Sequence, residues 1–389
     1  MARLDSKAYS ALKRKYDVDT IYSWSRISTY VEHPWEYYLK YIKRVPLNTT
    51  NVYNFFGTHA HDIVQDYILG KYEQNNMIKL FDDVVDDWFL NDKTLTFPEK
   101  EGSTSVQDGY INNLQHYFKY THYDFSDTEV DIEKPVRIVL NDGKGNIVYV
   151  GYIDLLYKRN GKTYIQDFKT SSKSGYSGKQ LDGASKQLKL YAIGVHQQFG
   201  IPYEDIVLRY DMQKYVTVSR LQKNGKWSKP SAKERQNWGE SLANFILKCL
   251  EDDGYDIIEA MEMIEHLPSA ETIDDLPEPV RDKIKIEPYF IDINMTEDMA
   301  NEMIEWTINN TRELEDKLLL DDLESVFPEP NLEIEDSFYY QVLAKDCLRY
   351  HKGYQESLKS QEMFEKTLSG DDLFDDSSSD TVDISNLFD

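Results

Sequence analysis

Residues 130–170 read VDIEKPVRIVLNDGKGNIVYVGYIDLLYKRNGKTYIQDFKT, and this stretch decides the fold. It contains three runs rich in β-branched and aromatic residues, separated by the turn-forming segments NDGKGN and KRNG. Asn-Gly between two such runs is the strongest short signal for a β-hairpin. The stretch therefore predicts three consecutive strands at about 130–140, 147–157 and 162–170, with a tight hairpin between the last two.

Three ionisable residues occupy the second and third predicted strands. Asp167 and Lys169 are two residues apart, so their side chains project from the same side of the third strand. Asp154 lies on the preceding strand, across the hairpin, and can reach the same neighbourhood. Two carboxylates that meet on a sheet repel each other unless a cation joins them.

A divalent cation between Asp154 and Asp167 gives this group its expected chemistry. Mg²⁺ prefers oxygen ligands and keeps several waters. A lysine beside it can polarise an attacking water and offset charge on a phosphate, so the three residues predict phosphodiester hydrolysis. The alternative is a pair of surface salt bridges. The apolar neighbours Ile153, Leu155 and Ile165 argue against it, because they place the acids in a sheet with a buried face.

Helical patterns flank the three strands. Residues 21–45 predict two helices, the first capped by Ser25 or Ser28 and the second begun by Pro34. The other predicted elements are a buried helix within 55–72 entered through Gly57-Thr58, helices at about 104–121 and 181–199, and a strand at about 205–219. The order of helix, three strands, helix and strand predicts an α/β fold with a mixed central sheet flanked by helices.

The chain is expected to divide into three parts. Residues 1–220 predict the core with its N-terminal helices, and residues 221–366 predict a mostly helical C-terminal part that packs on it. Residues 367–389 form an acidic tail without Lys or Arg, which predicts disorder in isolation. Leu387 and Phe388 there resemble the short peptides that dock to a sliding clamp or another replisome protein. The alternative is a tail that only solubilises the protein.

The charge of the chain is unevenly distributed. Overall it has 44 Lys and Arg against 69 Asp and Glu, a net charge of −25. Residues 155–200 reverse this balance with eight Lys or Arg against two acids, and we call them the basic sector. Salt screens each charge within about 10 Å, so this sector can still hold a phosphate backbone. A merely solvated face is the alternative.

Composition limits the class of protein and its location. With 389 residues and 40% apolar content, the chain can bury one large core or two ordinary ones. The apolar runs are too short to span a bilayer, and the first thirty residues lack a secretory stretch. We therefore expect no membrane association and a cytoplasmic location. Two distant cysteines, Cys249 and Cys347, indicate neither a disulfide framework nor a structural zinc site.

Further motifs extend the pattern on both sides of the strands. They are SWSRISTYVEHPWEYYLKYI within residues 21–45, Gly57-Thr58-x-x-His61, Gly151-x-Ile153-Asp154, Asp167-x-Lys169-Thr170 and Gln187-x-x-x-Tyr191. In order and spacing the sequence resembles the RecB-type exonucleases of the PD-(D/E)XK superfamily, which include AddB and the CRISPR-associated RecB-like nucleases. The matching motifs cover about residues 21–199, roughly half of the chain.

The resemblance implies a restriction-endonuclease-like core and further site residues. His61 would be a third metal ligand, and the backbone carbonyl of Phe168 would complete the metal shell. Glu133 would bind a second metal or a water, with a solvated strand carboxylate as the equal alternative. Gln187 and Tyr191 lie on one helix face and would contact the substrate strand or brace the site. For Tyr191 the alternative is core packing.

The sequence departs from the family in one respect. Many relatives hold an iron–sulfur cluster with four cysteines, one before the Pro of the first motif and three near the end. Here His33 takes the first position and only Cys347 lies in the terminal region. One thiol cannot hold such a cluster, so we expect none. Instead, we expect the aromatic residues of the two segments, with Tyr37, Tyr38 and Tyr41 facing inward, to pack together.

These residues predict a Mg²⁺- or Mn²⁺-dependent deoxyribonuclease, an exonuclease of phage-style replication, recombination or repair. A structure-specific endonuclease fits the same residues. The chain contains no Walker A pattern, so any helicase would be a separate protein. The alternative function is a DNA-binding or replisome-recruiting adaptor that keeps the fold with little catalysis.

Overall fold

The computed structural model describes residues 4–48, 50–91, 94–98, 105–265, 267, 272–332 and 339–369. The predicted acidic tail, including Leu387 and Phe388, lies outside the described residues from position 370 onward. The chain forms two compact units. We call residues 1–34 and 50–326 the sheet unit, and residues 35–49 and 327–389 the aromatic unit.

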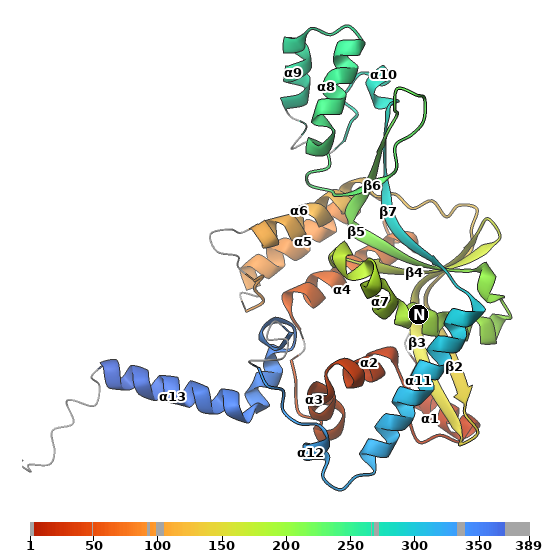
Figure 1. Cartoon of the computed structure of the whole chain (residues 1–389), viewed down its shortest axis with the longest axis vertical. Helices are drawn as coiled ribbons and strands as arrows, with labels where there is room; N and C mark the ends of the chain where they lie inside the picture. Colours follow the sequence, from red (N-terminus) through yellow and green to blue (C-terminus); the bar gives the residue numbers. More distant parts are fainter. Residues whose placement is uncertain are drawn as a thin grey trace, which may run out of the picture. The chain divides into compact units, whose positions relative to one another are not determined.

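A seven-stranded mixed sheet forms the centre of the sheet unit (Figure 1). Its strands are β1 (Ile21–Tyr22), β2 (Val130–Asn141), β3 (Asn146–Arg159), β4 (Lys162–Lys169), β5 (Ile206–Arg220), β6 (Ser231–Glu234) and β7 (Ile284–Asn294). The order is β1-β3-β4-β5-β6, with β2 paired to β3 and β7 paired to β5. Parallel pairing occurs between β1 and β3 and between β4 and β5. The predicted fold class, a mixed sheet flanked by helices, is confirmed.

The predicted hairpin joins β3 to β4 through Asn160 and Gly161. Both residues have positive φ, 52° and 76°, as the tight hairpin turn requires. Arg159 pairs with Lys162 directly beside the turn. The turn fixes the register of the two strands, and so it also fixes which residues of β3 and β4 lie opposite each other.

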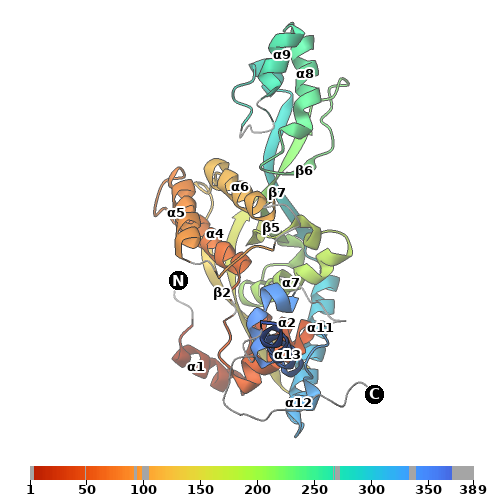
Figure 2. The same ribbon diagram turned by 90° about the vertical axis from the view of Figure 1, so that its left-hand side faces the viewer.

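Three helices cover one side of the sheet, α4 (Val52–Ile68), α5 (Asn76–Asn91) and α6 (Ser105–Tyr120) (Figure 2). Their apolar residues form one core with Ile132, Leu155 and Phe168 of the strands. The prediction that α4 begins at Gly57-Thr58 is wrong. The helix begins at Val52, because the Asn51 side chain accepts a hydrogen bond from the backbone N–H of Asn54 and caps it.

A second group of helices contains α1 (Ser6–Tyr16), α2 (Trp24–Glu32), α7 (Lys179–Phe199), α11 (Glu297–Leu318) and α12 (Leu323–Val326), with short turns η2 (Lys173–Tyr176) and η3 (Tyr203–Asp205). The helix α7 packs on β2 at Gly194, where a Cβ atom would lie 2.3 Å from Val136 Cγ2. Ser23, rather than Ser25 or Ser28, caps α2 by accepting from the Arg26 backbone N–H.

The strands β5 and β7 continue beyond the other strands and carry an extension, which we call the arm (residues 215–288) (Figure 1). It contains β6, η4 (Glu240–Leu242), α8 (Ala243–Asp252), α9 (Ile257–Glu265) and α10 (Glu278–Arg281). Val216, Val218 and Ile284 pack with these helices in a core separate from the one under α4. In the described part of residues 221–366, the region predicted to be mostly helical, helices occur together with the strands β6 and β7, which were not predicted.

The aromatic unit contains most of α3 (Pro34–Tyr37), then η1 (Tyr38–Lys43), η6 (Tyr339–Leu343), η7 (Lys345–Tyr350) and α13 (Lys352–Ser369). Tyr38 stacks on Phe327 at 5.9 Å, and Trp35 meets Tyr340 edge-on at 5.7 Å. Cys347 is buried beside them. The expectation that the aromatic residues of these two distant segments pack together is confirmed.

The described helices include no segment with both the length and the apolar character required to cross a bilayer.

Candidate active site

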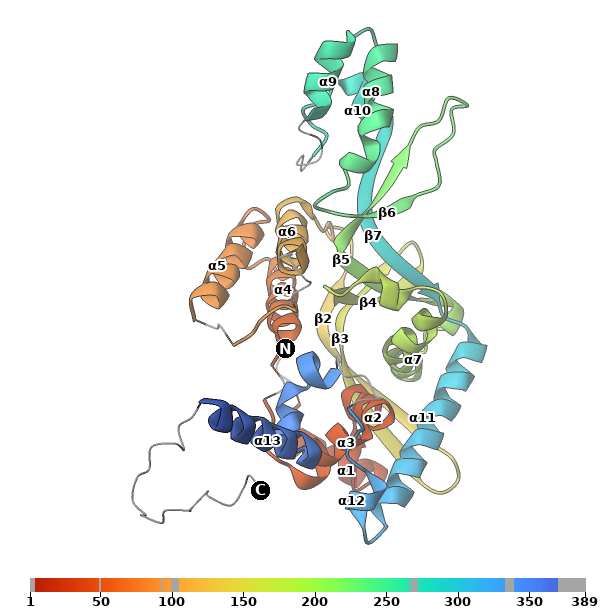
Figure 3. The same ribbon diagram turned by 60° about the vertical axis from the view of Figure 1, so that its left-hand side comes forward.

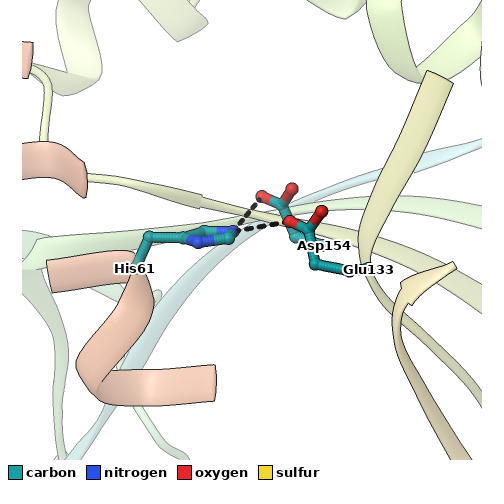
Figure 4. Close-up of side chains that lie close together, drawn as sticks. All are labelled: His61, Glu133 and Asp154. Carbon is teal, nitrogen blue, oxygen red and sulfur yellow. Dashed lines mark ion pairs between the residues drawn. The ribbon is translucent and has the colours of Figure 1, made fainter. Parts of the chain in front are cut away.

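His61, Glu133 and Asp154 converge from one helix and two strands (Figure 4). His61 Nε2, on α4, lies 3.2 Å from Asp154 Oδ2 on β3 and 3.9 Å from Glu133 Oε1 on β2. One ligand atom of each residue lies within 4.8 Å of the others. All three are partly buried, so the group is shielded and can still be reached from solvent.

The strand registers place Asp167 in the same row. Glu133 lies opposite Asp154, because the pairs Ile132–Leu155 and Lys134–Ile153 flank it. Asp154 lies opposite Asp167, one step beyond the pair Leu155–Gln166 at which the described β3–β4 ladder stops. Three adjacent strands therefore contribute one carboxylate each to a single row across the sheet.

The pairing of β3 leaves this row accessible. On one side, β3 pairs with β2 over its whole length. On the other, β1 pairs at Val148 and Tyr149, and β4 pairs from Leu155 onward. In the described ladders, residues 150–154 of β3 have no strand partner on that side. Asp154 ends this gap, so a ligand can approach it at the point where β1 and β4 part.

Glu133 has a backbone conformation that is rare for a residue with a side chain. Its φ is +50°, in the left-handed region, although it lies within a strand. Such a conformation costs about 1–3 kcal/mol and persists only where the surroundings enforce it. Here it accompanies a side chain directed at His61 and Asp154 (Figure 4). This observation favours a ligand role for Glu133 over a solvated strand carboxylate.

Asp167 is a buried carboxyl group beside another carboxyl group. It is 6% exposed and pairs with Lys169, whose Nζ lies 2.7 Å from its Oδ2. Burial raises the pKa of Asp167 to about 7, and Asp154 also raises it, although Lys169 acts to lower it. Burial also acts on the pKa of Asp154, but the hydrogen bond and charge of His61 outweigh it and lower that pKa. The two carboxyl groups thus differ, with the pKa raised at Asp167 and lowered at Asp154.

The neighbouring carboxylates raise the pKa of both Lys169 and His61. Burial opposes the charge of Lys169, but the nearby carboxylate of Asp167 outweighs it and raises the lysine pKa. Burial likewise opposes the charge of His61, and the hydrogen bond and charge of Asp154 raise its pKa nonetheless. Lys169 therefore acts as a cation and hydrogen-bond donor. Because it keeps its proton, it cannot serve as a general base.

Gln65 belongs to the site and was missed by the sequence interpretation. Its Nε2 donates to Glu133 Oε1 at 3.2 Å and lies 3.1 Å from His61 Nε2. Gln65 follows His61 by four residues on α4, so both share one helix face. That spacing is a signal that the sequence did offer. The amide bridges the two groups and holds them toward each other.

Gln187 and Tyr191 lie beside the carboxylates. Gln187 Nε2 donates to the Tyr191 hydroxyl at 3.2 Å. Burial raises the pKa of Tyr191 to about 12, and the charges of Asp154 and Asp167 add to the effect. The Tyr191 ring also packs on Gly151, where a Cβ atom would lie 2.2 Å from the ring. Tyr191 therefore packs in the core and still lies within electrostatic reach of the site, and Gly151 is required for both.

Phe168 and Gly57 pack between α4 and the end of β4, next to the site residues. The Phe168 side chain lies in the core under α4, with its ring edge-on to His61 at 5.9 Å. Gly57 lies against the segment that follows β4, since its Cβ would stand 3.5 Å from Thr170 Oγ1. The helix α4 thus approaches the end of β4 closely enough for His61 to reach Asp154.

The donor set fits a divalent metal ion. It offers one imidazole nitrogen and the carboxylate oxygens of Glu133 and Asp154, a mixed N/O set suited to Mn²⁺ and, through its oxygens, to Mg²⁺. Asp167 lies opposite Asp154 on β4 but is not in the group whose ligand atoms lie within 4.8 Å of one another. The raised pKa of Asp167 gives the independent physical reason, because a cation would relieve the repulsion between Asp154 and Asp167.

The basic sector is largely engaged inside the protein. Six of its eight cations contact other groups of the chain, namely Arg159, Lys162, Lys169, Lys173, Lys186 and Lys189. Lys189, for example, is 6% exposed and pairs with Asp182. Residues 155–200 therefore do not form a row of free charges along a phosphate backbone.

Comparison with known proteins assigns the chain to a family. A family model described as the PD-(D/E)XK nuclease superfamily matches residues 21–269, more than half of the chain. No curated protein matches the chain. A solved structure titled "Crystal structure of SSO0001" aligns with 54% of this chain and 73% of its own, at 15% identity and a TM-score of 0.18. A likeness at that TM-score supports no conclusion about fold or function.

Proposed function

The chain belongs to the PD-(D/E)XK nuclease superfamily, and from that premise we propose that it is a Mg²⁺- or Mn²⁺-dependent DNA exonuclease. We place it in the cytoplasm, in replication, recombination or repair. One observation carries the proposal. Glu133, Asp154 and Asp167 form a row on three strands, with His61 beside Asp154 and Glu133 and with Lys169 beside Asp167.

The residues divide into metal-holding and substrate-facing groups. His61, Glu133, Asp154 and Asp167 would hold the ion, together with the backbone carbonyl of Phe168. When bound, the ion supplies positive charge at the scissile phosphate and lowers the pKa of a water. Gln65 keeps Glu133 and His61 in place through its amide.

Lys169 and Tyr191 would act on the phosphate and the water. Because its pKa is raised, Lys169 stays protonated and donates hydrogen bonds to an attacking water or a phosphate oxygen. The Tyr191 hydroxyl, oriented by Gln187, is a second donor beside the carboxylates. These donors stabilise negative charge as it develops on the phosphate.

End-labelled linear DNA and a covalently closed circle of the same sequence test the proposal. With Mg²⁺ or Mn²⁺, we expect progressive shortening of the linear DNA and an intact circle. EDTA and the variant Lys169→Ala should each abolish shortening. Lys162→Ala is the matched control, because Lys162 lies at the other end of β4 in an ion pair with Asp205. It should retain activity.

Two results would contradict the proposal in different ways. Cutting of the circle would indicate an endonuclease on the same site. DNA that binds but stays intact with every divalent ion would instead indicate an adaptor with little catalysis. A sliding clamp or a separate helicase as partner is a further proposal, which pull-down with each purified protein would test.

A further inference from the structure

The hairpin between β5 and β6 is the most basic stretch of an acidic chain. Residues 220–233, RLQKNGKWSKPSAK, carry one arginine, four lysines and no acid. The helical side of the arm is the reverse, since residues 251–265 hold seven acids and no Lys or Arg. The arm therefore has one positive and one negative side, and both are shown in Figure 3 as parts of the same extension of the sheet.

The cations of this hairpin face solvent. Lys223, Lys226 and Lys229 are exposed, and no ion pair among the described residues includes them. Trp227 remains 37% exposed, while Lys285 Nζ lies 4.2 Å from the centre of its ring. The indole is thus held in place and still presents aromatic surface. We call Lys223, Lys226, Trp227, Lys229 and Lys285 the basic face of the arm.

The strand registers show which side of the arm this face occupies. Val216 and Val218 point into the core with α8 and α10, so Thr217 and Ser219 point to the opposite side. Lys285 pairs with Ser219, and Trp227 pairs with Leu221, which places both on that opposite side. Glu287, opposite Thr217, is an acid on the same side.

The basic face continues toward the candidate active site. Tyr215 lies on the same side of β5 as Thr217, and its hydroxyl accepts from the backbone N–H of Lys173 at 3.4 Å. Lys173 Nζ donates to the carbonyl of Ala232 on β6 at 3.0 Å. Lys173 follows Lys169 by four residues, in the loop that leaves β4. One continuous side of the sheet unit thus connects the catalytic lysine to the arm.

We propose that the basic face binds a single strand of the DNA substrate several nucleotides away from the bond that is cut. This inference rests on the proposed function. Lysines that face solvent suit phosphates, and an exposed, fixed indole suits stacking of an unpaired base. Only three of the eight cations of the basic sector are exposed, namely Lys158, Arg159 and Lys179, and the arm adds further exposed cations to these.

The distance sets a length for the strand. From Tyr215 to Leu221 there are six residue steps along β5, or about 20 Å at about 3.3 Å per residue. At about 3.4 Å per stacked nucleotide, that is about six nucleotides beyond the base of the arm. A strand of about five nucleotides fills the site without reaching the basic face. One of about 25 nucleotides reaches it.

Charge reversal on the hairpin, in the full-length protein, tests the inference. Lys223→Glu/Lys226→Glu is compared with Lys79→Glu/Lys144→Glu, which changes the same charge at two exposed lysines of α5 and the β2–β3 turn. We expect the first variant, and not the second, to lower the ratio of kcat/KM on the long strand to that on the short strand about tenfold. With EDTA, the slope of log Kd against log salt should fall by about 0.7 for each phosphate that the variant no longer neutralises.

A second variant separates stacking from charge. Trp227→Ala should weaken binding of the long single strand about fivefold and leave a duplex of equal length unaffected, while Trp227→Phe restores most of the binding. An unchanged length ratio and salt slope would overturn the arm inference, as would an equal reduction on both lengths. If the wild-type protein cuts no DNA, the proposed function fails. The salt slope with EDTA then still decides whether the arm binds DNA.

Discussion

Two buried aspartates on neighbouring strands of this protein differ in the charges and hydrogen-bond donors that surround them. Asp167 on β4 is 6% exposed and Asp211 on β5 is 1% exposed. Burial raises the pKa of both. Asp211 Oδ2 accepts hydrogen bonds from the hydroxyls of Tyr117 and Tyr123, and Arg235 lies close enough to lower its pKa. Asp167 has Lys169 on one side and the carboxyl group of Asp154 on the other.

The difference shows how a functional acid is distinguished from a structural one. Tyr117 of α6 and Tyr123 of the loop after it donate to Asp211 Oδ2, and the charge of Arg235, just after β6, also favours its ionised form, although Oδ1 has no hydrogen-bond partner among the described residues. The row of Glu133, Asp154 and Asp167 has more negative charge than its neighbours offset, and so it is completed only by a cation. Both aspartates are buried and have a raised pKa. They differ in whether the neighbouring side chains offset their negative charge.

The largest expected effect is on catalysis. Asp167→Asn should lower the single-turnover rate of DNA cleavage about 1,000-fold, because it removes a proposed metal ligand and the partner of Lys169. Asp211→Asn, the matched change one strand away, should stay within about threefold of the wild type, since it contacts no reacting group. An equal loss of activity in both variants, with both still folded, would contradict the different roles of Asp167 and Asp211.

The next effect is on stability. Asp211→Ala should lower the free energy of unfolding by about 3 kcal/mol, because two buried tyrosine hydroxyls lose their acceptor and the buried charge of Arg235 loses a nearby opposite charge. Urea unfolding followed by circular dichroism measures it. With EDTA present, Asp167→Ala should cost less than this, since it also removes repulsion with Asp154. A larger loss for Asp167→Ala would reverse the structural assignment of the two residues.

Metal binding gives a third comparison. At about 100 times its Kd, Mn²⁺ should raise the free energy of unfolding by about 2.7 kcal/mol. Asp211→Asn should retain this gain, and Asp167→Asn should lose most of it. Thermal unfolding with and without EDTA measures the difference. Equal stabilisation of all three proteins would place the ion outside the carboxylate row.

The smallest effect is on the pH dependence of the metal-free protein. Asp167 has a pKa of about 7 in the folded state against 3.8 as its ordinary value. Between these values the folded state binds the extra proton, so stability falls as pH rises and levels off above about pH 7. Relative to Asp167→Asn, the wild type should lose about 2 kcal/mol between pH 5 and 7 with EDTA. A gain in stability over this range would contradict the raised pKa.

The central strands and the aspartate row could be predicted because their signals are local. The alternation of residues in β3 and β4 and the Asn160-Gly161 turn set the register, and the register alone brings Asp154 opposite Asp167. The positive φ of Glu133 could not be predicted, because contacts from β3 and α4 impose it on a residue that prefers other conformations.

The strands of the arm and the state of the lysines depend on distant parts of the chain. The strand β6 has only four residues, and β7 contains Pro288, a residue that disfavours strands, and pairs with a strand some seventy residues earlier. Counting charges along the sequence singled out the basic sector and did not single out the hairpin of the arm. Their partners differ in the structure: Lys189 pairs with Asp182, whereas Lys226 faces solvent.

The aromatic unit has a consequence for the synthesis of the protein. Its first segment ends at residue 49 and its second begins at residue 327, so Trp35, Tyr37 and Tyr38 await partners that are translated about 280 residues later. At about 5–20 residues per second the delay is about a quarter of a minute to a minute. During that time these large apolar rings have none of their native cover from the second segment. Nascent chains therefore expose these rings to aggregation and to chaperone capture until the second segment, from residue 327 onward, has been translated.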